Sequence, residues 1–204
     1  HEEERTGYRA QSPHRELRLT GTRVVFHHRI RNIHPDMLGL LCMVMFYPFC
    51  KKSVTFPKPV SRRFQEAFSM GNLPLYEKVE GSYQPVKSIG ITNVDPDLEP
   101  YGGKNIALSY GGGFDSLAVQ LLFPEAIVIH EEALQPDGKL RPDGAAVYLK
   151  KIKKKGARVY DIVNNQRYGL TSPGDWSTWP ACAANAILLA TDFQIGYIMT
   201  GTTV

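Results

Sequence analysis

Strand-like and helical segments alternate regularly along the second half of the chain. The strand-like segments are short and apolar, and they are predicted at residues 105–109, 126–130, 157–163 and 196–200. Helices are expected between them, at residues 116–122, 145–155 and 180–193. Strands that alternate with helices form parallel sheets, because each parallel connection needs a crossover. The sequence therefore predicts an α/β fold, a parallel sheet with helices on both faces, with ligands at the carboxyl ends of the strands.

The first hundred residues follow a less regular pattern. Strands are expected at residues 17–20, 22–30, 53–56 and 86–94, and helices at 37–46 and 62–70. Pro35 suits the first turn of the first helix, and Ser61 is expected to cap the second. A polar segment rich in Pro and Gly, residues 93–103, predicts a boundary. We expect a small α+β module over residues 1–100 and an α/β domain over 101–204, incomplete at its C-terminus.

Composition excludes several classes of protein. The chain has 204 residues, of which 43% are hydrophobic and 22% charged, as in ordinary globular proteins. A formal net charge of +4 is too small to indicate a dedicated nucleic-acid binder. Three widely spaced cysteines do not form a disulfide framework, which favours a reducing, cytoplasmic setting. The apolar run 37–49 is shorter than the ~20 residues of a membrane span, so we expect a buried helix and no membrane insertion.

Three successive glycines, Gly111, Gly112 and Gly113, lie between the first predicted strand and helix of the second half. Glycine tolerates backbone angles that a Cβ forbids, and it lets an anion approach the main chain. The helix that follows offers unpaired amides and the positive end of its dipole. Ser116 is expected to cap this helix or to donate its hydroxyl to a phosphate oxygen. The loop is therefore a candidate site for phosphate or pyrophosphate.

Three nucleotide-binding motifs compete for this loop. A Walker loop needs lysine after its glycines, and no lysine lies between Lys104 and Lys139. A dinucleotide fingerprint fits at Gly111 and Gly113 and has an acidic residue, Glu131, further on, but Ser116 stands where its third glycine belongs. The fingerprint is incomplete but not absent, so a dinucleotide-binding oxidoreductase stays an alternative.

The third motif matches at four positions, Gly112, Gly113, Asp115 and Ser116. They resemble the Ser-Gly-Gly-x-Asp-Ser loop of the PP-loop ATP pyrophosphatases, which belong to the adenine nucleotide alpha hydrolase-like (HUP) superfamily with its Rossmann-like sheet. The resemblance covers about residues 104–204. Residues 180–190 and 197–201 look like the 7-cyano-7-deazaguanine synthase branch, although Ala184 stands where that branch tends to have arginine. Gly111 stands where the family usually has serine.

The resemblance implies ATP and Mg²⁺ as cofactors and the cleavage of ATP between its α and β phosphates. Asp115 would bind Mg²⁺, and Asp115 and Ser116 would be the catalytic residues. The implied ATP site comprises Ser109, Tyr110, Gly111, Gly112, Gly113, Phe114, Asp115, Ser116, Ile129, His130 and Gly201.

The implied activity is that of an adenylating ligase. A substrate carboxylate or carbonyl oxygen attacks the α phosphate, pyrophosphate leaves, and a nitrogen or sulfur donor then displaces AMP. The alternative is an ATP-binding sensor without turnover, which the departures at Gly111 and Ala184 motivate. We expect a small-molecule substrate rather than tRNA, and a role in recognition or homodimerisation for residues 1–100.

Three other features carry weaker hypotheses. The lysine-rich segment 150–155 is expected to end a helix, where cations meet the negative end of the dipole, rather than to bind tRNA. His130 either contacts a ligand or packs at the end of its strand. Cys182 is expected to be a small buried residue.

Overall fold

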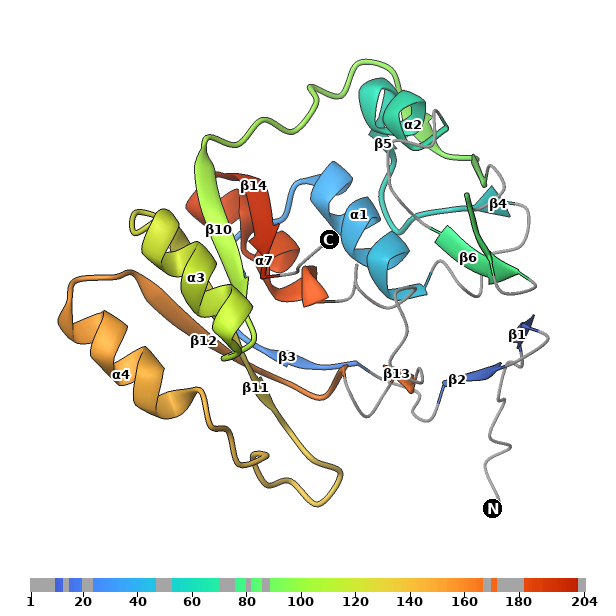
Figure 1. Cartoon of the computed structure of the whole chain (residues 1–204). Helices are drawn as coiled ribbons and strands as arrows, with labels where there is room; N and C mark the ends of the chain where they lie inside the picture. Colours follow the sequence, from blue (N-terminus) through green and yellow to red (C-terminus); the bar gives the residue numbers. More distant parts are fainter. Residues whose placement is uncertain are drawn as a thin grey trace.

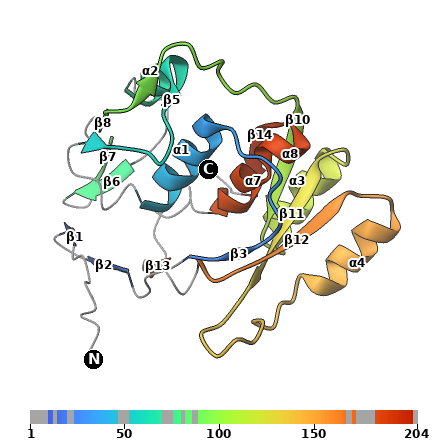
Figure 2. The ribbon, with the colours of Figure 1, turned by 180° about the vertical axis from the view of Figure 1, so that it is seen from behind.

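The computed structural model describes residues 10–12, 15–19, 24–46, 53–69, 76–79, 82–85, 89–166, 170–171 and 182–201. Its main element is a five-stranded sheet with the strand order β14-β10-β11-β12-β3. The strands are β3 (Phe26–His27), β10 (Asn105–Tyr110), β11 (Ile127–Ala133), β12 (Val159–Asn164) and β14 (Ile195–Thr200). Figure 1 shows this sheet with its helices, and Figure 2 shows the same arrangement from behind.

Four neighbouring strands of this sheet, β14, β10, β11 and β12, are parallel, and β3 pairs with β12 in the antiparallel direction. The α/β class is therefore confirmed. The prediction of a parallel sheet holds for these four strands and not for β3, whose antiparallel pairing with β12 makes the five-stranded sheet mixed. Of the expected strand 22–30, the described part is regular only at Phe26 and His27.

The helices follow the sequence pattern with small shifts at their ends. They are α1 (Pro35–Phe46), α2 (Arg62–Ser69), α3 (Phe114–Leu122), α4 (Ala146–Lys154), α7 (Ala184–Leu188) and α8 (Ala190–Phe193). The helix expected over 180–193 is divided at Leu189, and its first two residues lie outside the described part of the chain. The lysine-rich segment ends α4, and Gly156, at φ +90°, follows as the stop signal that the sequence predicts.

The described short strands outside the main sheet belong to the first hundred residues, except for β13. The two-residue strands β4 (Ser53–Val54) and β5 (Val60–Ser61) pair in parallel with β8 (Gly90–Ile91) and β9 (Val94–Asp95). Their apolar residues pack with α2 and with Met43 of α1 in a small cluster of their own. The remaining short strands are β1 (Ala10–Ser12), β2 (Arg15–Leu19), β6 (Tyr76–Val79), β7 (Ser82–Pro85) and β13 (Leu170–Thr171).

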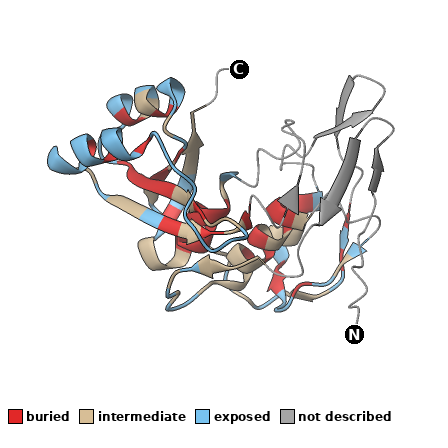
Figure 3. Ribbon diagram, turned by 90° about the horizontal axis from the view of Figure 1, so that it is seen from below, coloured by how far each residue is buried: buried red, intermediate tan, exposed pale blue. Residues whose placement is uncertain are grey.

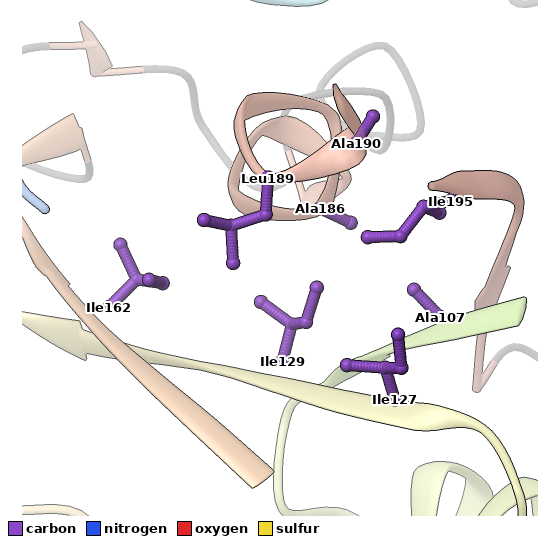
Figure 4. Close-up of a cluster of buried hydrophobic side chains, with 8 residues drawn as sticks. All are labelled: Ala107, Ile127, Ile129, Ile162, Ala186, Leu189, Ala190 and Ile195. Atoms are coloured by element: carbon purple, nitrogen blue, oxygen red, sulfur yellow. The ribbon is translucent and has the colours of Figure 1, made fainter. Parts of the chain in front are cut away.

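Alternation along the strands sends side chains into two apolar clusters. Ala107, Ile127, Ile129 and Ile162 pack against Ala186, Leu189 and Ala190 of the α7–α8 segment (Figure 4). The residues on the other face of the same strands, such as Leu108 and Val128, pack against Leu149 and Ile152 of α4. In Figure 3 the buried residues gather along the strands and the segments packed on them. Period-two alternation is the reason that one strand serves both clusters.

The N-terminal region is joined to this core through α1. Leu41, Val44 and Met45 of α1 pack against Ile187 and Leu188 of α7. The described part of the apolar run, residues 37–46, therefore lies in a helix packed against the core, as expected. None of the helices in the described ranges is long and apolar enough to cross a membrane. The boundary at residue 100 stays a prediction, while β3 and α1 lie against the second half of the chain.

A buried carboxylate, Asp36, holds three segments together. Its oxygens accept hydrogen bonds from the Ser61 amide (2.7 Å), the Ser61 hydroxyl (2.8 Å) and the Tyr101 amide (3.1 Å). Ser61 in turn accepts a bond from the Phe64 amide, which confirms it as the cap of α2. The contacts of Asp36 fix α1, α2 and the segment that enters β10.

Replacement of Asp36 by alanine leaves these three donors, of which the two of Ser61 are buried, without this acceptor. We expect Asp36→Ala to lower the free energy of unfolding by about 3 kcal/mol or more. Urea denaturation followed by circular dichroism measures the loss, with the exposed Asp97→Ala as the matched control. Equal stability of the two variants would contradict this role.

Candidate functional site

A cavity of about 470 Å³ lies at the carboxyl ends of β10, β11 and β14. Its wall comprises Ser109, Tyr110, Gly111, Gly113, Asp115, Ser116, His130, Glu131, Ala133, Arg141, Pro142, Asp143, Gly144, Cys182, Asn185, Thr200 and Gly201. The central strand β10 has β11 on one side and β14, the last strand of the sheet along the chain, on the other. Such a reversal of strand order opens a crevice in which α/β proteins bind ligands. The volume is within the range of small-molecule sites.

The three glycines play different parts in the loop. Gly112 has φ +78°, and a Cβ on it would collide with the side chain of Ala145. Gly111 and Gly113 face open space where a Cβ would stand, and both line the cavity. Gly112 therefore seats the loop on the start of α4, whereas its neighbours leave bare backbone beside the cavity.

A second close approach brings β14 against the start of α3. A Cβ on Gly201 would meet the backbone of Asp115 and Ser116. Ser116 is buried and donates its hydroxyl to the Gly113 carbonyl at 3.0 Å. The helix begins at Phe114, two residues before the predicted start, so Ser116 lies inside the first turn and is not its cap. No side-chain hydrogen bond caps α3.

Free amides at the start of a helix attract anions, and those of α3 are not covered by a side-chain cap. The charged side chains of the cavity wall are nevertheless mostly acidic: Asp115, Glu131 and Asp143 face a single guanidinium, Arg141. An anionic ligand therefore needs a cation, either a bound metal ion or Arg141, to offset these carboxylates.

His130, in the middle of β11, is buried between two carboxylates. Its Nε2 contacts Asp143 of the cavity wall, and its Nδ1 lies 3.2 Å from Asp161. Lys153 of α4 donates to the other oxygen of Asp161 at 2.7 Å. Both ring nitrogens of His130 therefore have a carboxylate partner, while the residue also lines the cavity. The choice between packing and ligand contact, which the sequence leaves open, stays a prediction.

Two further side chains from β10 stand at the cavity. The Ser109 hydroxyl donates to the Cys182 carbonyl at 2.6 Å and so joins β10 to the segment before α7. Burial raises the pKa of the Tyr110 phenol above its ordinary value of 10.0, and Tyr148 and Asp143 raise it further. The phenol therefore stays protonated at neutral pH.

Most of the residues that the resemblance implies come together. Ser109, Tyr110, Gly111, Gly113, Asp115, Ser116, His130 and Gly201 all line the cavity. Three do not: Gly112 packs on Ala145, Phe114 is 88% exposed, and the Ile129 side chain is buried in the core between the sheet and α7. The expectation of a buried Cys182 is wrong, because this residue is exposed and borders the cavity.

Arg141, Asp143 and Asn185 also line the cavity and were not predicted from the sequence. Asn185 of α7 is buried, accepts a hydrogen bond from Asn164 and borders the cavity. Arg141 directly precedes the turn-forming sequence Pro142-Asp143-Gly144, which contains Asp143 and lies in the connection after β11. Connections that follow a parallel strand begin at the carboxyl edge of the sheet, which is the signal that could have found these two residues.

The wall offers limited ligands for a metal ion. Within the described ranges, no group of three His, Cys, Asp or Glu side chains is arranged to hold one. Mg²⁺ in nucleotide sites often takes only one or two carboxylates and completes its shell with phosphate and water oxygens. Asp115, exposed in the first turn of α3 and bordering the cavity, fits that use.

Comparison with protein-family models, with curated proteins and with solved structures finds no match for this chain. We therefore infer function from the residues of the cavity themselves.

The different roles of the glycines give a direct test. We expect Gly112→Ala to lower the free energy of unfolding by about 1–3 kcal/mol, because a left-handed residue gains a Cβ that meets Ala145. Gly111→Ala, the matched control one residue away, should leave stability within about 0.5 kcal/mol. Urea denaturation of both variants checks this, and a reversed order would contradict the described loop.

Proposed function

We propose that this chain binds ATP at the Gly111–Ser116 loop and uses it as an adenylating ligase of the PP-loop type. The four parallel strands would form a Rossmann-like core of the HUP kind with helices on both faces. Their order and their two apolar clusters support this interpretation.

One observation carries the proposal. The glycine loop exposes bare backbone to a cavity of about 470 Å³, at the start of a helix whose first turn no side chain caps. Backbone amides and a helix dipole at this place favour phosphate oxygens. The loop lies beside the switch in strand order, where a nucleotide can extend from the loop across β10 toward the end of β11.

In this proposal the cavity residues have separate roles in adenylation. The loop amides hold the triphosphate, and Asp115 holds Mg²⁺, which neutralises the charge of the phosphates. A substrate oxygen attacks the α phosphorus, the bond from that phosphorus to the bridging oxygen breaks, and pyrophosphate leaves. Catalysis of this kind depends on orientation and charge neutralisation, so no general base needs to be assigned.

Calorimetric titration of ATP with Mg²⁺ tests this proposal. We expect binding by the wild-type chain and binding weaker by about tenfold or more in Asp115→Asn, because the metal loses its carboxylate. Asp137→Asn, on the exposed turn after β11, is the control and should bind ATP normally.

Lack of ATP binding by the wild-type chain, or binding indifferent to Asp115, would overturn the proposal. Release of AMP and pyrophosphate with a carboxylic-acid substrate separates a ligase from a sensor, which binds ATP without turnover.

A dinucleotide-binding oxidoreductase is the second candidate, and one observation favours it. Glu131, at the end of β11, borders the cavity where such proteins place the acidic residue that binds a ribose hydroxyl. NAD binding that weakens in Glu131→Gln, with no ATP binding, would support this function instead.

A further inference from the structure

The segment after β11 forms the wall of the cavity opposite the glycine loop. After the strand the chain makes a tight turn, in which the Gln135 amide donates to the Lys139 carbonyl at 2.8 Å. It then returns, and the Arg141 amide donates to the Ala133 carbonyl at 2.8 Å. Arg141, Pro142, Asp143 and Gly144 follow along the wall. The turn thus places a guanidinium at the carboxyl end of β11.

Both sides of Arg141 are fixed by hydrogen bonds. On one side is the backbone bond to Ala133. On the other, Asp143 contacts the buried His130 and accepts the Ala145 amide at 2.8 Å. Because Gly112 packs directly on Ala145, the two walls of the cavity are in contact at this point. The position of Arg141 relative to the glycine loop is therefore set by packing.

The guanidinium group of Arg141 is available to bind a ligand. Among the residues that the structure describes, no hydrogen bond or ion pair engages the Arg141 side chain. The neighbouring carboxylate of Asp143 is already engaged by His130 and the Ala145 amide. Among the described residues of the wall, Arg141 is also the single Lys or Arg, and three carboxylates lie beside it.

We propose that Arg141 is the side chain that binds the phosphate oxygens of the nucleotide, and that His130 positions it by holding Asp143. The proposal rests on the proposed nucleotide site and adds to it a cation absent from the loop motif. A guanidinium binds phosphate through two parallel N–H donors, and this geometry requires a fixed approach. The Asp143–His130–Asp161 chain supplies that fixation.

Titrations of wild type and Arg141→Gln with two ligands, ATP and adenosine, test the phosphate contact. We expect ATP with Mg²⁺ to bind about tenfold or more weakly to the variant, with adenosine affinity changed by less than about twofold. Lys139→Gln is the matched control, because it removes the same charge from the same turn while Lys139 is not part of the cavity wall. It should bind both ligands as wild type does.

The outcomes separate the two proposals. If wild type binds no ATP, the nucleotide site is overturned and this inference with it. If wild type binds ATP and Arg141→Gln binds it equally well, the inference alone is overturned. Equal weakening of ATP and adenosine, or equal losses in Lys139→Gln, would also overturn it, because the effect would then not come from a phosphate contact of Arg141.

The positioning role of His130 has its own readout. Asparagine at this position can replace Nδ1 toward Asp161 but not Nε2 toward Asp143, whereas glutamine can reach Asp143. We expect His130→Asn to weaken ATP binding and His130→Gln to restore it in large part. The double variant with Arg141→Gln should bind ATP no more weakly than Arg141→Gln alone. Additive losses would show that His130 acts independently and would overturn its positioning role.

Discussion

The parallel pairing of β10 with β11 on one side and β14 on the other is the constraint on which the site depends. It brings the carboxyl ends of three strands to one edge of the sheet and leaves a crevice where their connections diverge. The close approach of Gly201 to the backbone of Ser116 then fixes the start of α3 against β14. Any side chain at Gly201 would force the helix away and change the cavity.

The cavity combines two environments that are chemically opposed. The glycine loop presents backbone amides and a helix dipole, which favour anions. The charged side chains among the described lining residues are mainly carboxylates, which repel anions. A phosphate ligand would bind there only if a cation offset the carboxylates, either a metal ion at Asp115 or the guanidinium of Arg141. The buried His130 contributes indirectly, since its two carboxylate partners belong to the wall segment and to β12.

The N-terminal region supports this architecture through polar as well as apolar contacts. Asp36 joins the start of α1 to Ser61 and to the segment leading into β10. The Tyr101 hydroxyl lies within hydrogen-bond distance of the carbonyls of Ala190 and Ile195, and burial raises the pKa of its phenol. The entry to the central strand is therefore held from both sides, and the position of the glycine loop at its far end follows from it.

Local sequence determined the elements and the loop. Apolar runs and turn residues gave four parallel strands, the helix starts at Pro35 and Ser61, and the glycine loop between β10 and α3, because these signals depend on neighbours along the chain. Only the tertiary structure decided that β3 closes the sheet in the antiparallel direction, that Cys182 is exposed, and that Arg141, Asp143 and Asn185 join the site. The pairing of β3 and the place of Asn185 arise from contacts between residues distant in sequence, for which a single sequence carries no local signal. For Arg141 and Asp143 the turn residues beside them are a local signal, but their contacts with the cavity depend on the folded chain.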